Sequence, residues 1–212
     1  PPTLRRQRQM CIRDRSYMPA VASRFDNLGV GFAPYLQPPP DGVIRWTVGE
    51  PGFPTPEPVI STAVSELLDG KTKYTRGQGS PALCEAVANH LMKTSNISVS
   101  PENVLITPGA KQALLYSYMT VLNPGDEAIL LSPSWASYEP MISIIGGVPV
   151  NVPVDRKNFH PDMDAIRSSI TNRTRMIMVN SPCNPTGAVY TREEIEEILS
   201  LIHISEPTRQ IR

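Results

Sequence analysis

Short apolar runs alternate with stretches of helical periodicity from Asn103 onward, and this alternation limits the folds that the chain can adopt. The runs that read as strands cover residues 104–107, 128–132, 148–152 and 176–180. The helical stretches cover residues 110–122, 137–145, 162–169 and a segment that starts at Thr191. Strands joined through helices by short links form mostly parallel sheets, and strands that are apolar on successive residues are buried on both faces. We therefore expect an α/β fold in which a mostly parallel sheet is sandwiched by helices.

Two further helices are expected before this region. Thr55, Pro56 and Glu57 supply a capping hydroxyl, a proline at the first helical position and an acid in the first turn, which predicts a helix over 56–68. The side chains expected on its apolar face are Val59, Ile60, Ala63, Val64 and Leu67.

The second of these helices is expected over 81–93, after Ser80. Its predicted stripe consists of Leu83, Val87, His90 and Leu91. We interpret His90 as a structural residue rather than a ligand. Near the C-terminus, Thr191 and Glu194 have the Thr-x-x-Glu spacing of a capping box, which predicts that a helix starts there.

Composition narrows the class of protein. The 212 residues are 40% hydrophobic and 19% charged, and 20 basic side chains balance 20 acidic ones, so nothing global indicates nucleic acid or an anionic membrane as a partner. No apolar run approaches the roughly 18 residues that would span a bilayer. The 3 cysteines and 3 histidines are widely spaced, which predicts reduced thiols in a cytoplasmic protein and no metal site.

Both ends of the chain differ in character from its middle. Residues 1–16 hold five arginines without usable periodicity, and residues 202–212 interrupt a helix. We expect both segments to be non-native or disordered tails that resemble adapter read-through, with a basic targeting arm as the alternative for the first. Residues 17–48 are expected to form an N-terminal arm and part of a small domain. Residues 49–201 would then form a truncated large domain.

Ligands of an open parallel sheet bind beyond the carboxyl ends of its strands, so the residues after each run are candidates for a site. Gly109, Ala110 and Lys111 follow the first run and open a helix, where free N–H groups and a partial positive charge suit phosphate; the alternative is an ordinary turn. Trp135 follows the second run and could stack on a flat ring or simply cover the core.

A rigid loop follows the fourth run. Its sequence, SPCNPTG, contains two prolines and a glycine around Asn184, whose amide could donate a fixed hydrogen bond to a ligand oxygen. An elaborate turn is the alternative. Cys183 is not favoured as a nucleophile, because no feature of the surrounding sequence would lower its pKa.

Six blocks of the chain, in order and over about residues 43–200, resemble class I/II aminotransferases of fold type I. The blocks are VGEPGFPTPE, GKTKYTRGQGSPALCEAVANHL, ITPGAKQAL, NPGDEAILLSPSWASYEP, GGVPV and NSPCNPTGAVYTREE. The resemblance is to the N-terminal half of the aspartate aminotransferase-like subgroup. It implies the α/β PLP-transferase fold, with pyridoxal 5′-phosphate as cofactor, a homodimer, and an amino acid and a 2-oxo acid as small-molecule substrates.

The resemblance also implies roles for individual residues. Gly49 matches a backbone group near the substrate carboxylate, and Tyr74 matches a tyrosine that reaches the cofactor phosphate of the other subunit. The residues that match the phosphate cup are Gly109, Ala110 and Lys111. Trp135 matches the ring that stacks on the cofactor, and Asn184 matches the amide that binds its phenolic oxygen; both also contribute to the substrate site. Cis peptide bonds are implied at 132–133 and 184–185.

The Schiff-base lysine of the family, with the Asp and Arg that accompany it, has no match in this chain, so we assign no catalytic residue and expect the chain as written to be inactive. Lys111 is no substitute, because it opens the helix of the phosphate cup. The expected activity of the family is transfer of an amino group between an aspartate-like or aromatic L-amino acid and a 2-oxo acid. Alternatives are a carbon–sulfur lyase, synthase or decarboxylase of the same fold, or a non-catalytic cofactor-sensing regulator domain.

Overall fold

The computed structural model describes residues 38, 40–44 and 49–201. The two tails and most of the N-terminal arm predicted above lie outside the described residues. The chain divides into two compact units, with the boundary of the described part between Val121 and Leu122. Each unit is described by itself.

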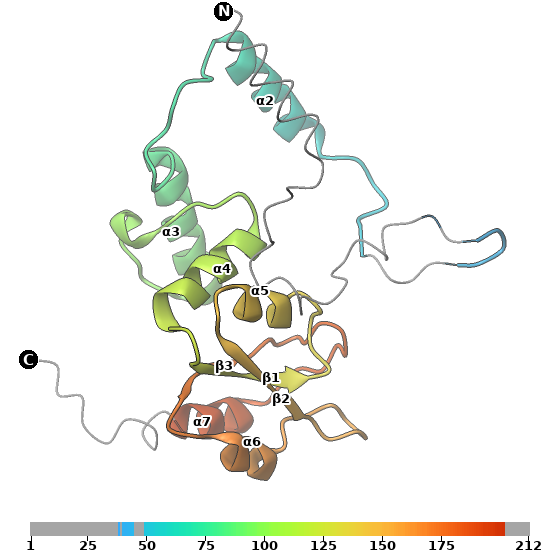
Figure 1. Ribbon diagram of the computed structural model, residues 1–212. Helices are drawn as coiled ribbons and strands as arrows, with labels where there is room; N and C mark the ends of the chain where they lie inside the picture. The colour runs from blue at the N-terminus through green and yellow to red at the C-terminus, as the bar shows by residue number, and fades with distance from the viewer. Residues whose placement is uncertain (1–37, 39, 45–48, 202–212) are drawn as a thin grey trace, which may run out of the picture. The chain divides into compact units, whose positions relative to one another are not determined.

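The first unit contains the helical elements before the sheet (Figure 1). They are α2 (Glu57–Leu68), α3 (Pro81–Ser95), the 3-10 turn η3 (Pro101–Asn103) and α4 (Ala110–Val121). A small core in this unit joins Cys84 and Ala88 of α3 to Val104, with Ile106 packed against it. All three predicted helices of this region are therefore present.

The second unit contains the sheet and the helices that cover it. Its elements are β1 (Glu127–Ser132), α5 (Tyr138–Ile144), β2 (Val148–Pro153), α6 (Met163–Ser169), β3 (Thr174–Met178) and α7 (Arg192–Ser200). The strand order is β2-β1-β3, and both pairings are parallel, with Ile129 of β1 opposite Val150 on one side and Ile177 on the other. The parallel α/β fold expected from the alternating pattern is confirmed.

The strand order determines which face each helix covers. The chain moves from β1 to β2 in one direction and from β2 past β1 to β3 in the other. Because such crossovers are right-handed, α5 and α6 must lie on opposite faces, as Figure 1 shows. The core on the α6 side joins Ile129 and Leu131 to Ile166 of α6 and Ile198 of α7. Residues 128–131 of β1 are buried, which agrees with the successive apolar residues of this strand.

Side-chain caps start the last two helices. Asp162 accepts a hydrogen bond from the Ala165 N–H (3.0 Å) at the start of α6. At the start of α7, the Thr191 hydroxyl accepts the Glu194 N–H (3.2 Å), and the Glu194 carboxylate accepts the Thr191 N–H (2.7 Å). The capping box predicted from the Thr-x-x-Glu spacing is confirmed.

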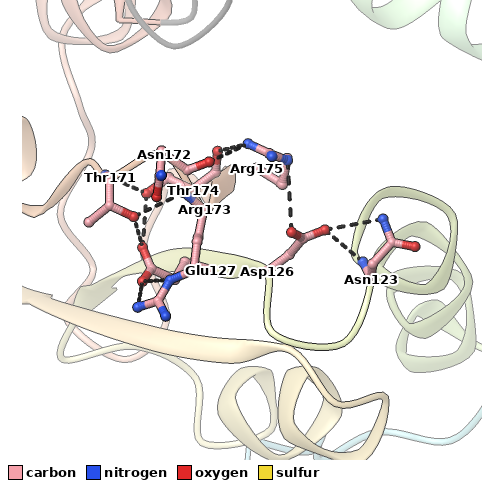
Figure 2. A network of polar contacts seen from close by, with 8 residues as sticks. All are labelled: Asn123, Asp126, Glu127, Thr171, Asn172, Arg173, Thr174 and Arg175. Atoms are coloured by element: carbon pink, nitrogen blue, oxygen red, sulfur yellow. Dashed lines mark hydrogen bonds and ion pairs between the residues drawn. The ribbon is translucent and has the colours of Figure 1, made fainter.

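A polar network lies where β1 and β3 begin (Figure 2). The buried carboxylate of Glu127 accepts hydrogen bonds from the Thr171 hydroxyl (2.5 Å), the Arg173 guanidinium (2.6 and 3.0 Å) and the Thr174 hydroxyl (3.2 Å). Next to it, Asp126 pairs with Arg175 at 3.8 Å. These contacts connect the amino ends of β1 and β3. The candidate site residues follow the carboxyl ends of these strands, at the opposite end of the sheet.

The start and the apolar face of α2 differ from the prediction. Pro56, not Thr55, occupies the N-cap position of α2, and no side chain caps the helix. None of the helix is buried, so the predicted apolar face is exposed in this unit. The periodicity located the helix correctly, but the pattern alone does not say what covers its apolar face.

Three further expectations are corrected. Residues 104–107 form no strand: Ile106 makes one backbone bond, to the Gln78 carbonyl (2.8 Å), in place of a ladder. On α3 the buried positions are Cys84 and Ala88, so Leu83 and His90 lie outside the core-facing stripe. The buried face of α3 is shifted by about one residue from the predicted stripe because Cys84 and Ala88 pack beside Val104. The last predicted strand also begins and ends two residues earlier than expected, at Thr174 and Met178.

Candidate functional site

A pocket lies at the carboxyl ends of β1 and β3, in the second unit. Its walls come from the two strand ends and from the loops that follow them. The lining residues are Leu130, Leu131, Ser134, Tyr138, Met178, Asn180, Cys183, Asn184 and Tyr190. This is the edge of the sheet at which ligands of parallel α/β folds bind.

Asn184 lies in a loop that is stabilised by hydrogen bonds between its own residues. The backbone N–H of Asn184 donates to the Asn180 side-chain oxygen (2.9 Å), while its own side chain is exposed. Around it, the Cys183 N–H donates to the Ala188 carbonyl (2.8 Å), and the Gly187 N–H donates to the Cys183 carbonyl (2.7 Å). The loop therefore fixes the backbone of Asn184 and leaves its amide able to meet a ligand.

Trp135 lies in the loop after β1, which borders the same pocket. Its ring packs edge-on against Tyr138, with centroids 5.3 Å apart and an interplanar angle of 81°, and Tyr138 lines the pocket. The thiol of Cys183 donates to the Pro133 carbonyl at 3.8 Å and so links the two loops. The structure thus brings the loop of Trp135 and the loop of Asn184 together. It has cis peptide bonds at 132–133 and 184–185, as expected, and another at 181–182.

Two tyrosines of the pocket were missed by sequence reasoning. Burial raises the pKa of Tyr190 to about 12, and the neighbouring Cys183 thiol and Glu194 carboxylate act in the same direction. Burial also raises the pKa of Tyr138, again with a contribution from Cys183. Both phenols are therefore neutral hydrogen-bonding groups at ordinary pH. Asn180 was missed as well, although it ends the predicted strand over 176–180 and the strand-end rule could have found it.

The predicted phosphate cup lies at the start of α4, in the first unit. Gly109 has φ +86°, a left-handed conformation that favours glycine, and its N–H donates to the Thr107 carbonyl (2.8 Å). The backbone N–H groups of the first turn of a helix lack acceptors within the helix. Ala110 and Lys111 occupy this turn, and both residues are exposed. Backbone N–H groups at the positive end of a helix are suitable donors for a phosphate.

Gln78, which sequence reasoning did not single out, supports the segment that leads to this cup. Its side-chain amide donates to the carbonyls of Glu102 (2.7 Å), Val104 (2.8 Å) and Pro101 (3.2 Å). A glutamine in a loop carries no periodic signal, so the sequence could not have marked it. Gly49 and Tyr74 also lie in the first unit, and both are exposed.

Other kinds of site receive no support from the described part of the chain. Within residues 49–201 no three His, Cys, Asp or Glu side chains are grouped closely enough to hold a metal ion. No helix among the described residues is long and apolar enough to cross a bilayer. Cys84 and Cys183 are buried free thiols.

The sheet and its carboxyl-edge pocket define an α/β protein of the kind that binds a small ligand beyond its strand ends. The sequence profile of the family "Aminotransferase class I and II" matches residues 41–205, and the chain belongs to this family. Proteins of this family depend on pyridoxal 5′-phosphate. The recognition of the family and its fold from the six sequence blocks is thereby confirmed.

Curated relatives are aspartate aminotransferases. The aspartate/prephenate aminotransferase of Thermus thermophilus is 45% identical over 160 residues, which are 75% of this chain and 42% of the relative. The aspartate aminotransferase of Thermotoga maritima is 44% identical over 163 residues, or 76% of this chain and 43% of the relative. The chain thus spans less than half the length of these relatives.

Solved structures agree with the assignment of the fold. The aspartate aminotransferase of Thermus thermophilus with maleate has a TM-score of 0.71 at 45% identity, covering 76% of this chain and 42% of that chain. The Pyrococcus protein-A1 has a TM-score of 0.80 at 32% identity, covering 88% of this chain and 50% of that chain.

Proposed function

We propose that the protein containing this chain is an aminotransferase that moves an amino group between an L-amino acid and a 2-oxo acid with pyridoxal 5′-phosphate. The observation that carries the proposal is the pocket at the ends of β1 and β3, where the exposed amide of Asn184 and the loop of Trp135 share one site. This arrangement suits a flat ring with an anionic oxygen at its edge.

The chemistry of the donor groups fits the cofactor. Pyridoxal 5′-phosphate supplies an electron sink for the bonds of the substrate α-carbon, and the protein supplies binding and orientation. Its phosphate matches the N–H groups at the start of α4, and its ring oxygen matches a neutral amide donor such as Asn184. The pocket walls also include the neutral phenols of Tyr138 and Tyr190, so no fixed charge there competes with a polar ring.

We assign each residue one task. The turn at Gly109 and the backbone N–H groups of Ala110 and Lys111 bind the phosphate. Trp135 holds the plane of the ring, and the amide of Asn184 donates a hydrogen bond to the ring oxygen and favours its ionised form. Trp135 and Asn184 also border the space for the substrate.

Gly49 would meet the substrate carboxylate through its backbone. Tyr74 would act in a homodimer, by reaching the phosphate held by the other subunit. Its side chain is fully exposed in this unit and so is open to a partner. No lysine lines the described pocket, so the proposal assigns no catalytic amine to residues 49–201. We expect the 212-residue polypeptide alone to lack transaminase activity.

We choose the substrates to test from the names of the relatives. Aspartate is the first amino donor to test, with 2-oxoglutarate and prephenate as acceptors, because the relatives are aspartate and aspartate/prephenate aminotransferases. Aromatic amino acids are the second group of donors. The proposed location is the cytoplasm, and we propose no nucleic-acid or membrane partner.

The proposal is tested on the protein expressed from its native gene, in parallel with the 212-residue polypeptide. Each is incubated with pyridoxal 5′-phosphate, one donor and one acceptor, and the new 2-oxo acid and new amino acid are quantified. We expect equal amounts of the two products from the former protein and none from the latter. Release of ammonia or carbon dioxide without a new amino acid would instead identify a lyase or decarboxylase of the same fold.

A further inference from the structure

We propose that Cys183 and Tyr190 are positioning residues that set the distance between the loop of Asn184 and the loop of Trp135. The inference rests on the proposed function for its consequence, because these two loops are assigned to the cofactor ring. The arrangement itself is independent of that assignment, since it consists of contacts within the second unit.

Cys183 is the residue immediately before Asn184, and its backbone and its thiol are bonded to different loops. Both its N–H and its carbonyl are bonded within that loop, at 2.8 and 2.7 Å. Its thiol instead reaches the Pro133 carbonyl at 3.8 Å, a residue 50 positions earlier and two before Trp135. The thiol is therefore a direct polar connection between the two walls of the pocket.

Tyr190 is bonded to the loop that contains Cys183. Its N–H donates to the Ser181 hydroxyl (2.9 Å), so its backbone is tied to the start of the same loop. Its side chain is buried in the same core cluster as Cys183, and the Cys183 thiol contributes to the raised pKa of the phenol. Both side chains belong to the core cluster that contains Ile129 and Leu131, so neither can move without disturbing packed neighbours.

A purely space-filling role is the competing explanation, and the chain contains a second thiol that allows the two to be separated. Cys84 is 3% exposed and Cys183 is 8% exposed, and each thiol approaches a backbone carbonyl, at 3.7 Å to Val104 for Cys84. Cys84 lies on α3 in the first unit, far along the chain from both loops. Replacement of either thiol by alanine removes the same volume and a similar weak hydrogen bond.

The test compares Cys183→Ala, Cys183→Ser and Tyr190→Phe with the matched control Cys84→Ala, in protein expressed from the native gene. Calorimetry measures the affinity for pyridoxal 5′-phosphate and, separately, for inorganic phosphate. We expect Cys183→Ala to weaken cofactor binding by about 3- to 10-fold, the loss of one modest hydrogen bond, without changing phosphate binding. Cys183→Ser, which keeps a hydroxyl donor, should recover most of the loss, and Tyr190→Phe should show a smaller loss.

A second measurement needs no cofactor. The 212 residues contain 2 tryptophans, so Trp46→Phe, together with phenylalanine at any tryptophan that the native gene encodes outside these residues, leaves Trp135 as the only one. In this background we expect Cys183→Ala, but not Cys84→Ala, to increase quenching of Trp135 by acrylamide. Circular dichroism checks that each variant is folded, and Tyr190→Phe, in which a smaller increase in quenching is expected, replaces Cys183→Ala if the latter is not.

The outcomes distinguish the two proposals. If the unmodified protein does not bind pyridoxal 5′-phosphate, the proposed function fails, and the quenching of Trp135 still decides the inference. If the protein binds the cofactor but Cys183→Ala and Cys84→Ala lose affinity and stability in parallel, Cys183 only fills space and the inference is wrong. Unchanged quenching in Cys183→Ala would also contradict it.

Discussion

At the scale of single residues, Asn184 separates a structural role from a binding role. Its backbone N–H is bonded to Asn180, whereas its exposed side chain makes the contact proposed for the ligand. Replacement by alanine should therefore remove the ligand contact and leave the loop intact. We expect Asn184→Ala to bind pyridoxal 5′-phosphate about tenfold more weakly, with a free energy of unfolding within about 0.5 kcal/mol of the original.

Calorimetry and urea unfolding measure these two quantities. Asn89→Ala, on the exposed face of α3, is the matched control and should change neither. Unaltered cofactor affinity in Asn184→Ala would remove Asn184 from the site.

Gly109 gives a second prediction at this scale, because another glycine of the chain has nearly the same φ. Gly109 and Gly125 have φ of +86° and +88°, and an added Cβ would meet nothing within 4 Å at either position. Replacement by alanine should therefore cost about 1 kcal/mol of backbone strain in both cases. Only Gly109→Ala should also weaken the binding of inorganic phosphate, which calorimetry would show. Equal phosphate affinity in the two variants would contradict the proposed cup.

Individual site residues were predictable where a general rule applied to the sequence. Trp135 and Asn184 follow apolar runs, and the carboxyl ends of parallel strands meet at one edge, so their loops could be placed together. Tyr190 could not be found in this way. It lies 12 residues after the end of β3, and it reaches the pocket only because its loop folds back on Ser181.

At the scale of elements, the structure confirms one of the two predicted helix caps and not the other, so we expect opposite effects of mutation at the two positions. Thr191 caps α7 through its hydroxyl, whereas no side chain caps α2, where Thr55 was expected to do so. Thr191→Ala should therefore lower the free energy of unfolding by about 1 kcal/mol, and Thr55→Ala should leave it unchanged. Urea unfolding measures both. A comparable loss in the two variants would mean that the capping box contributes nothing specific.

Most elements could be predicted because their signals are local. The helices and the three strands of the sheet follow from periodicity, punctuation by proline and glycine, and the capping spacing. The failures have a common cause. Residues 104–107 have the apolar composition of a strand, and the face of α3 depends on what packs against it, so both were determined by contacts remote in sequence.

At the scale of the whole molecule, the network around Glu127 makes stability depend on pH. The Thr171 hydroxyl, together with the Arg173 guanidinium and the Thr174 hydroxyl, holds the pKa of Glu127 below its ordinary value although burial opposes this. Figure 2 shows these groups around one carboxylate. A carboxylate with a lowered pKa in the folded state stabilises the fold above its unfolded pKa of about 4.3, and the contribution is lost as the pH falls through the folded value.

Glu127→Gln should consequently lower the urea midpoint at pH 7, and the difference from the original protein should shrink below about pH 4. Glu85→Gln, on the exposed face of α3, is the control for the change in charge. A deficit in Glu127→Gln that stays the same from pH 7 to pH 3 would show that the ionised form of the carboxylate is not what stabilises the network.

The strand order also has a consequence for the time course of folding. Because β3 pairs with β1 and not with its predecessor β2, the contact between Cys183 and Pro133 closes a segment of 50 residues. Closing so long a segment is slow compared with forming local helices, so the pocket at the ends of β1 and β3 is completed only when β3 docks. During refolding with pyridoxal 5′-phosphate present, helical circular dichroism should therefore return before the cofactor is captured. A newly made chain would spend that interval unable to hold its cofactor.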